Sequence, residues 1–286
     1  MLKVRGLTRR MGEKRLESIN LDVERGTVHT IIGNNGVGKT TLFEAMSGDY
    51  PGKGSVTING HPVSSLKGKE QFSYIPQTVT ELETFTLRIL HNLHKTHDSM
   101  WREDRFQALI KQFNLPMNKH LQRMSIGMKQ KSMLALQLSR DTPLLMLDEP
   151  YTGLDMEGQQ ILDRLLLQHM EASDDHAIVL ATHIADEVQR LADYISILQD
   201  GTLSGRVEKD ELQRRWQRIW IEERVQGISQ APGVVSVSST RTQEIITQDA
   251  EATKAWLTER GVMIIKSQSL KLHESIPHIL KTGVSA

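Results

Sequence analysis

The chain has 286 residues, enough for one large domain or two smaller ones, and 35 lysines and arginines balance 35 aspartates and glutamates. This zero net charge argues against nucleic acid as the main partner, because proteins that bind duplexes usually carry a basic excess. The absence of cysteine excludes disulfides and thiolate metal sites. We expect a soluble chain, because the sequence has neither the apolar core of a signal peptide nor an apolar run of the roughly 20 residues that cross a bilayer.

Strands are predicted near the N-terminus over 2–5, 19–23 and 28–32. The third strand leads into Gly33–Thr41, whose spacing fits the phosphate-binding loop G-x-x-x-x-G-K-[ST]. A helix then begins at Thr41, and the N-terminus of a helix favours an anion. This strand–loop–helix setting favours a phosphate site over a glycine-rich turn that binds nothing.

The residues of this loop have distinct physical roles. Its glycines let the backbone turn tightly, so that successive N–H groups point at phosphate oxygens. Lys39 would place a positive charge on the β- and γ-phosphates, and the Thr40 hydroxyl would ligate Mg²⁺.

The next segment changes from strand to helix signals. Residues 55–63 read as a hairpin around Asn59-Gly60, and residues 72–76 as a strand that ends at Gln77. From Thr86 to about Leu138 apolar residues recur at helical spacing, with a break at Pro116 and a new helix near Ile126. An all-helical insert is therefore expected.

A continuous apolar run, Leu144–Leu147, ends at Asp148-Glu149 and is typical of a strand buried on both faces of a parallel sheet. The carboxylate of Asp148 would hold Mg²⁺ directly or through water, and Glu149 would orient and polarise an attacking water. The alternative, a surface pair at a strand end, is disfavoured by the phosphate loop. Alternating elements follow: helix 157–172, strand 177–181, helix 184–192, strand 194–198 and a turn at 200–201.

Beyond about Arg206 the pattern predicts a small α+β appendage, with strands at 234–238, 244–247 and 262–266 and helices at 251–260 and 270–280. Trp216 and Trp220 lie among arginines, which allows a membrane-surface helix. An ordinary linker helix or strand that docks the appendage is the favoured interpretation.

Four further motifs occur in order along the chain. Gln77 follows a strand, Met124–Met128 precedes a helix, Thr152–Asp155 follows the carboxylate pair, and His183 ends a strand. With the phosphate loop and Asp148-Glu149, this series resembles the ATP-binding cassette (ABC) ATPases, the nucleotide-binding subunits of ABC transporters.

The resemblance covers about residues 1–205 and implies an α/β fold. It would be an ABC-type P-loop NTPase core with a RecA-like sheet, a β subdomain and a helical insert at about 84–140. Residues 206–286 would be a C-terminal accessory domain.

The resemblance also implies a role for each matched position. The Walker A loop would bind nucleotide through Gly33, Asn34, Asn35, Gly36, Val37, Gly38, Lys39, Thr40 and Thr41. Catalysis would involve Lys39, Gln77, Glu149 and His183, with His183 touching the γ-phosphate, and Thr40, Gln77 and Asp148 would hold Mg²⁺. In isolation, His183 would read as a core histidine at a strand end.

A second set of positions is implied to act on a neighbouring subunit. Ser125 and Gly127 would contact the γ-phosphate of ATP held by the other protomer, and Asp155 would lie at the dimer interface. The site is then composite, and a monomer should hydrolyse ATP poorly.

Two departures from the family pattern stand out. Ile126 and Met128 replace Gly and Gln of the common Leu-Ser-Gly-Gly-Gln signature, a form that resembles ATPases of bacterial drug, antibiotic-peptide and polymer exporters. Met11 stands where an aromatic commonly stacks on adenine, so a thioether or arginine stack would have to replace it.

The implied function is an ATP- and Mg²⁺-dependent ATPase that energises transport, with export the expected direction. Its implied partners are separate transmembrane permease subunits, received by the insert near 84–97, and a second ATPase protomer, of the same or an unlike chain. The implied location is peripheral, on the cytoplasmic face of the cell membrane. The alternatives are a soluble ABC ATPase acting on ribosomes or DNA, and a regulatory sensor cassette.

Overall fold

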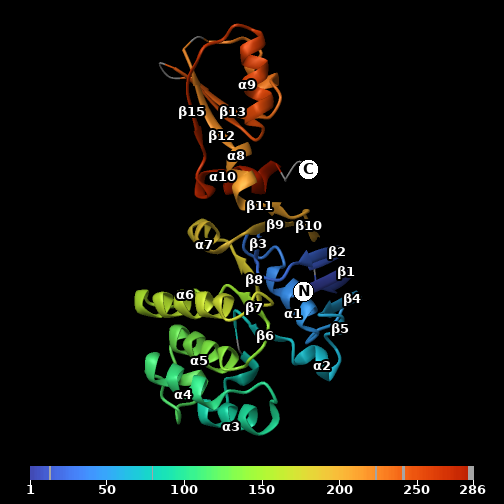
Figure 1. The fold of residues 1–286 in the computed structure, drawn as a ribbon, viewed down its shortest axis with the longest axis vertical. Helices are drawn as coiled ribbons and strands as arrows, with labels where there is room; N and C mark the ends of the chain where they lie inside the picture. Colours follow the sequence, from blue (N-terminus) through green and yellow to red (C-terminus); the bar gives the residue numbers. More distant parts are fainter. Residues whose placement is uncertain (13, 79, 223, 240–241, 283–286) are drawn as a thin grey trace. The chain divides into compact units, whose positions relative to one another are not determined.

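The computed structural model describes residues 1–286 except 13, 79, 223, 240–241 and 283–286 (Figure 1). Contacts divide the chain into two compact units. One comprises Met1–His183 with Leu198–Leu203, and the other comprises Ile184–Ile197 with Ser204–Ala286. No helix among the described residues is long and apolar enough to span a bilayer.

The first unit opens with an antiparallel sheet of order β2-β1-β4-β5. Its strands are β1 (Leu2–Met11), β2 (Lys14–Val23), β4 (Lys53–Ile58) and β5 (His61–Pro62). The predicted hairpin is confirmed, since Asn59 and Gly60 both have positive φ, 49° and 80°, as a two-residue type I′ turn requires. β1 and β2 are longer than predicted because backbone pairing with neighbours, and not apolar alternation, extends them through polar residues such as Arg9 and Arg10.

A buried parallel sheet follows, in which β6, β7, β8 and β3 lie side by side in that order. These strands are β3 (Val28–Ile32), β6 (Phe72–Ile75), β7 (Leu144–Asp148) and β8 (Ala177–Thr182), continued beyond β3 by the end of β9 (Tyr194–Gln199) and by β10 (Thr202–Leu203). Every residue of β3, β7 and β8 is buried. This confirms the interpretation of Leu144–Leu147 as a strand that is buried on both faces. Because parallel strands end at one edge, the residues after β3, β6, β7 and β8 meet there.

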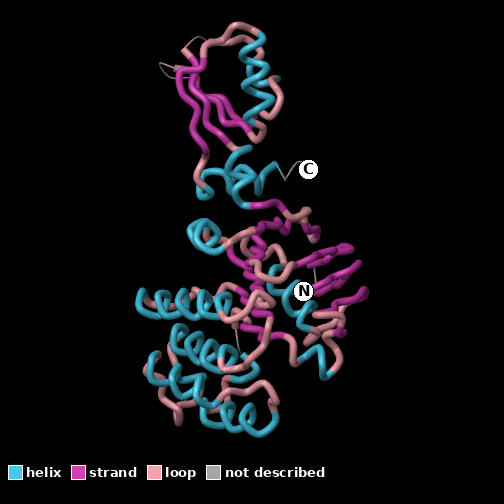
Figure 2. Tube along the Cα trace, in the orientation of Figure 1, coloured by secondary structure: helices cyan, strands magenta, loops and turns pink. Residues whose placement is uncertain are grey.

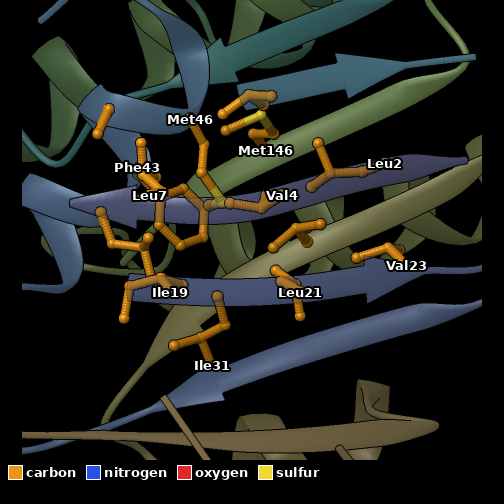
Figure 3. Packing of buried hydrophobic residues seen from close by; sticks show 14 of the residues in the cluster. Leu2, Val4, Leu7, Ile19, Leu21, Val23, Ile31, Phe43, Met46 and Met146 are labelled. Atoms are coloured by element: carbon orange, nitrogen blue, oxygen red, sulfur yellow. The ribbon is translucent and has the colours of Figure 1, made fainter. Parts of the chain in front are cut away.

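Helix α1 (Lys39–Ser47) is packed between these two sheets. Figure 3 shows Phe43 and Met46 of α1 among Val4 and Leu7 of β1 and Met146 of β7, and these side chains belong to one buried cluster. Phe43 and Met46 are fully buried. The helix is therefore held on opposite faces, which fixes the direction in which its N-terminal loop leaves β3.

The stretch between β6 and β7 is helical, as Figure 2 shows. It contains α3 (Leu87–His97), α4 (Glu103–Gln112) and α5 (Ile126–Leu138). A further short helix, α2 (Leu66–Lys69), comes before β6. His91 stacks on Phe106 with ring centroids 4.5 Å apart, and its Nε2 lies 2.8 Å from Glu103. Partial burial acts to raise the pKa of Glu103, but hydrogen bonds from His91 and Trp101 outweigh it and lower that pKa to about 2.

The second unit contains a four-stranded antiparallel sheet of order β13-β14-β12-β15. Its elements are α7 (Ala185–Leu191), β11 (Val207–Glu208), α8 (Lys209–Arg215), β12 (Gln217–Ile221), β13 (Val234–Ser239), β14 (Gln243–Thr247), α9 (Ala250–Glu259), β15 (Ile264–Ser269) and α10 (Leu272–Thr282). Ile219, Ile221 and Ile245 pack with Leu257 of α9, and α10 packs against α7. This is the α+β arrangement that the sequence predicts.

The membrane-surface helix considered for Trp216 and Trp220 is wrong. Helix α8 ends at Arg215, so the two indoles do not share a helical face. Trp216 is buried, and Trp220 lies in β12, where Lys266 Nζ is 5.0 Å from its ring centroid. Pairing of β12 with strands on both sides overrides the helical spacing of the tryptophans.

A histidine pair lies at the end of α6 (Met156–Glu171). The rings of His169 and His176 stack with centroids 4.3 Å apart. His169 Nε2 is buried, and among the residues that the structure describes it has no hydrogen-bond partner. Burial lowers the pKa of His169 from 6.5 to about 4, and the neighbouring His176 adds to this. His169 is therefore neutral in the folded chain at physiological pH.

We expect this histidine to contribute to loss of stability in acid. Since the unfolded state takes up the proton first, stability is full above pH 6.5 and falls as the pH drops toward about 4. His169→Gln should reduce the loss in unfolding free energy between about pH 7 and pH 5 by about 1–2 kcal/mol, measured by urea denaturation. His97→Gln, at an exposed position, is the control. Equal acid sensitivity of His169→Gln and wild type would contradict the assignment.

Candidate functional site

The phosphate loop needs glycine at defined positions. A Cβ on Gly33 would lie 2.7 Å from the carbonyl oxygen of Leu198 and 2.8 Å from Cγ1 of Val37. Gly36 and Gly38 have φ of 82° and 111°, which side chains rarely adopt. Asn34 and Asn35 are exposed at the tip of the loop. The backbone thus turns closely into α1, where the N–H groups at the start of the helix favour an anion.

A charge cluster, in which Lys39 and Glu149 are buried and His183 is exposed, joins the loop to the ends of two strands. Nζ of Lys39 donates to the carbonyl oxygen of Gly33 at 2.8 Å and forms an ion pair with Glu149 at 3.1 Å. The side chains of Lys39 and Glu149 are only 7% and 4% exposed. The Nδ1 atom of His183 lies 2.9 Å from both carboxylate oxygens of Glu149. The structure therefore brings together three of the residues predicted for catalysis.

Glu149 has an unusual backbone conformation. Its φ is 50°, in the left-handed region that residues other than glycine rarely occupy. Its N–H donates to the carbonyl oxygen of Ala181 on β8 at 3.0 Å. This conformation costs of order 1 kcal/mol or more, and strain of this kind clusters at functional sites.

The residues predicted to hold a metal lie at the same edge. The Thr40 hydroxyl is 3.5 Å from Oε1 of Gln77. Both carboxylate oxygens of Asp148 are buried, and neither has a hydrogen-bond partner in the described part of the chain. Burial raises the pKa of Asp148 to about 6, and the charge of Glu149 acts in the same direction. An orphaned carboxylate among hydroxyl and amide oxygens fits a hard cation such as Mg²⁺.

The remaining predicted residues form a second group. Ser125 caps α5 by accepting a hydrogen bond from the Met128 N–H at 3.3 Å, and Gly127 lies in the first turn of that helix. Asp155 caps α6 by accepting from the Gly158 N–H at 2.9 Å. The hydrogen bonds and ion pairs described for Ser125 and Asp155 connect them to α5 and α6, and none of those described reaches the phosphate loop. These two groups of predicted residues are therefore separate in the contacts described for the single chain.

In the loop predicted to lie near adenine, Arg9 is already engaged by other residues of the chain. Nη1 of Arg9 donates to the Thr41 carbonyl at 3.2 Å and pairs with Glu44 at 3.1 Å. Its guanidinium also lies 5.2 Å from the ring centroid of Tyr50. Arg9 therefore anchors β1 to α1, which leaves Met11, 44% exposed, as the apolar surface of the loop. The sequence carried no signal for this pair, because its members lie 35 positions apart.

Comparison with known proteins decides the family. The putative ABC transporter ATP-binding protein AlbC of Bacillus subtilis (strain 168) is 30% identical over 199 residues, 65% of this chain and 81% of that protein. The chain belongs to the family of ABC transporter ATP-binding proteins. The family model described as "ABC transporter" matches residues 16–152 of this ABC ATPase.

Other relatives agree with this assignment. The ABC transporter ATP-binding protein YtrB of the same organism is 24% identical over 226 residues, 77% of this ATPase and 76% of the relative. The xylose import ATP-binding protein XylG of Moorella thermoacetica is 29% identical over 227 residues, 74% of this chain and 45% of the relative.

Solved structures confirm the predicted fold class. The ATP-binding subunit of an ABC transporter matches with a TM-score of 0.65 and 28% identity, covering 75% of this chain and 92% of the other. A dimeric ATP-binding cassette in a post-hydrolysis state, bound to ADP and Pi, matches with a TM-score of 0.60 and 23% identity, covering 73% and 98%. The chain is accordingly an ABC-type ATPase.

The buried ion pair gives a stability prediction. Lys39→Met would leave the Glu149 charge buried without its ammonium partner, so the free energy of unfolding should fall by about 3 kcal/mol in urea denaturation without nucleotide. Adding Glu149→Gln to Lys39→Met removes that charge and should restore more than half of the loss. A stability of Lys39→Met equal to wild type would show that the pair contributes nothing.

Proposed function

We propose that this ABC transporter ATP-binding subunit hydrolyses ATP at a site shared between two protomers and energises export through separate membrane subunits. The observation that carries the proposal is the Lys39–Glu149–His183 cluster, in which Lys39 and Glu149 are buried. It lies at the edge where the strands end, beside Asp148, whose carboxylate has no hydrogen-bond partner among the described residues. Phosphoryl transfer depends mainly on positioning and charge neutralisation, which this arrangement provides.

Each residue of the cluster has a proposed role. The N–H groups of the phosphate loop and Lys39 bind the β- and γ-phosphates. Thr40, Gln77 and Asp148 hold Mg²⁺, which neutralises developing phosphate charge when bound. Glu149 orients the attacking water and accepts its proton, while His183 holds the carboxylate in position and contacts the γ-phosphate.

The second half of each site comes from a partner protomer. Ser125 and Gly127 lie at the start of α5, where free N–H groups favour an anion. The apolar side chains of Ile126 and Met156 beside them are 71% and 77% exposed, which suits burial against another subunit. We propose a head-to-tail dimer in which these groups contact the γ-phosphate of the partner's ATP and Asp155 lies in the interface.

A groove in the first unit supports docking of a membrane subunit. Its volume is about 510 Å³, and Leu66, Leu93, His94, His97 and Arg140 are among its lining residues. On α3, Ile89 and Leu93 are 43% and 50% exposed. We place the permease contact on this face of α3 and on the groove beside it. We also assign residues 1–205 to the ATPase domain and residues 206–286 to an accessory domain. This contact would hold the chain at the cytoplasmic face of the cell membrane.

Export is the finer part of the proposal and rests on the exporter-type form of the signature at Ser125–Gln130. A relative named for xylose import leaves import as the competing direction, which transport into inside-out vesicles would distinguish. The other class, a soluble ABC ATPase acting on ribosomes or DNA, is disfavoured by the zero net charge. A sensor cassette would associate with its membrane partner but support no transport.

The catalytic assignment predicts the behaviour of Glu149→Gln. With ATP and Mg²⁺, turnover should fall by about 100-fold or more, because the neutral amide cannot accept the water proton. Meanwhile an ATP-dependent dimer should accumulate in size-exclusion chromatography with light scattering. Turnover that survives the substitution would remove Glu149 from the mechanism. Loss of activity without a dimer in either protein would instead point to an unlike partner or a required membrane subunit.

The docking surface predicts a separation of functions. Ile89→Asp combined with Leu93→Asp should abolish co-purification with the native membrane subunits and transport by the reconstituted complex, because charges on this face oppose apolar contact. The ATPase activity of the isolated subunit should be retained. Leu167→Asp, at a site 58% exposed on α6, is the matched control. Full transport by the double variant would move the permease contact elsewhere.

A further inference from the structure

Two turns of the chain are in direct backbone contact. The first is the signature turn, residues 125–128, where α5 begins, and the second is the Glu149 turn, residues 149–155, between β7 and α6. A Cβ on Gly127 would lie 2.3 Å from the carbonyl oxygen of Gly153. A Cβ on Gly153, whose φ is 77°, would lie 2.8 Å from Cγ2 of Ile126. The two turns therefore pack closely enough that movement of one displaces the other.

A buried hydrogen bond joins the same two segments. Nε2 of Gln130 on α5 donates to the carbonyl oxygen of Pro150 at 3.0 Å, and the Gln130 side chain is only 5% exposed. Pro150 directly follows Glu149. A buried carbonyl that loses its donor costs about 1–3 kcal/mol, so this bond resists separation of the signature helix from the carboxylate.

An ion pair completes the connection. Nζ of Lys131, 15% exposed, lies 2.8 Å from Oδ1 of Asp155. The same carboxylate caps α6 through the Gly158 N–H, and the Tyr151 hydroxyl donates to Asp163 of α6 at 2.5 Å. The turn between Glu149 and α6 is thus tied to α6 at its far end and to α5 through Lys131.

We infer that Gln130 and Lys131 are positioning residues that join the signature turn and the Glu149 turn into one block. This inference rests on the proposed composite dimer, in which the signature turn serves the partner's ATP and Glu149 serves the chain's own. A displacement of the signature turn is then transmitted to Glu149 in the same chain, and the two ATP sites are coupled through each subunit.

Mixed dimers test this coupling, with two differently tagged copies purified in sequence so that only one copy retains Glu149. In the first arrangement Gln130→Met or Lys131→Met lies in the copy that retains Glu149, and the partner carries Glu149→Gln. In the second, the same variant lies in the copy that carries Glu149→Gln, and the partner is wild type. The working site uses the variant's own carboxylate in the first case and the variant's signature turn in the second.

Coupling predicts that turnover falls about ten-fold in both arrangements, while the single chain's affinity for ATP is unchanged. Lys131→Arg should restore turnover, because it keeps the ion pair. Lys129→Met is the matched control, because Lys129 lies two residues before Lys131 on the same helix and forms an ion pair with Glu83. A loss confined to the second arrangement would overturn the inference, because Gln130 and Lys131 would then serve the signature turn alone.

Amide hydrogen exchange in the single chain provides a measurement that does not depend on the dimer. Gln130→Met and Lys131→Met should raise exchange at residues 151–155 about ten-fold over Lys129→Met. Unchanged exchange there would overturn the inference. A mixed dimer without a substitution at Gln130 or Lys131 is the reference. If it does not form, or does not hydrolyse ATP, the proposed dimer is wrong. The exchange experiment then still decides whether the two turns are joined.

Discussion

The buried ion pair between Lys39 and Glu149 is the interaction on which the site depends. Two charges can lie together out of water only when each is satisfied by close partners, and here Gly33, Glu149 and His183 supply them. These partners come from the ends of different strands of one parallel sheet. The order of that sheet therefore determines where charge is concentrated, and a γ-phosphate would enter a site whose charged groups are already held in place.

The packing of α1 explains why this edge is rigid. The helix lies between the N-terminal sheet and the parallel sheet, and Phe43 and Met46 fill the space between them (Figure 3). The pair of Arg9 with Glu44 adds a polar link on the same helix. The phosphate loop is thus fixed by packing at its helical end and by close contact with Leu198 at Gly33. Strain at Glu149 can persist because its N–H is held by the Ala181 carbonyl on β8 and its side chain is held by Lys39.

The surface around Ser125 and Asp155 has a physical consequence for the dimer that we propose. Ser125 and Asp155 use their side chains to cap helices and remain on the surface, with exposed apolar residues beside them. Such a surface gains from burial against another subunit. Since the signature turn also packs against the turn after Glu149, binding on one face is mechanically connected to the catalytic carboxylate. In the proposed dimer, this connection favours cooperation between the two sites over independent catalysis by single chains.

The sequence by itself determined the phosphate loop, the buried strands and the helical insert. Glycine spacing, continuous apolar runs and helical periodicity are local signals, and Gly33, Leu144–Leu147 and Leu87 carry them. Only the tertiary structure decided which distant side chains meet: Arg9 with Glu44, Gln130 with the Pro150 carbonyl, and β12 in place of a helix at Trp220. These contacts depend on strand order and helix packing, which bring together residues far apart in the chain, and no local pattern specifies such pairs.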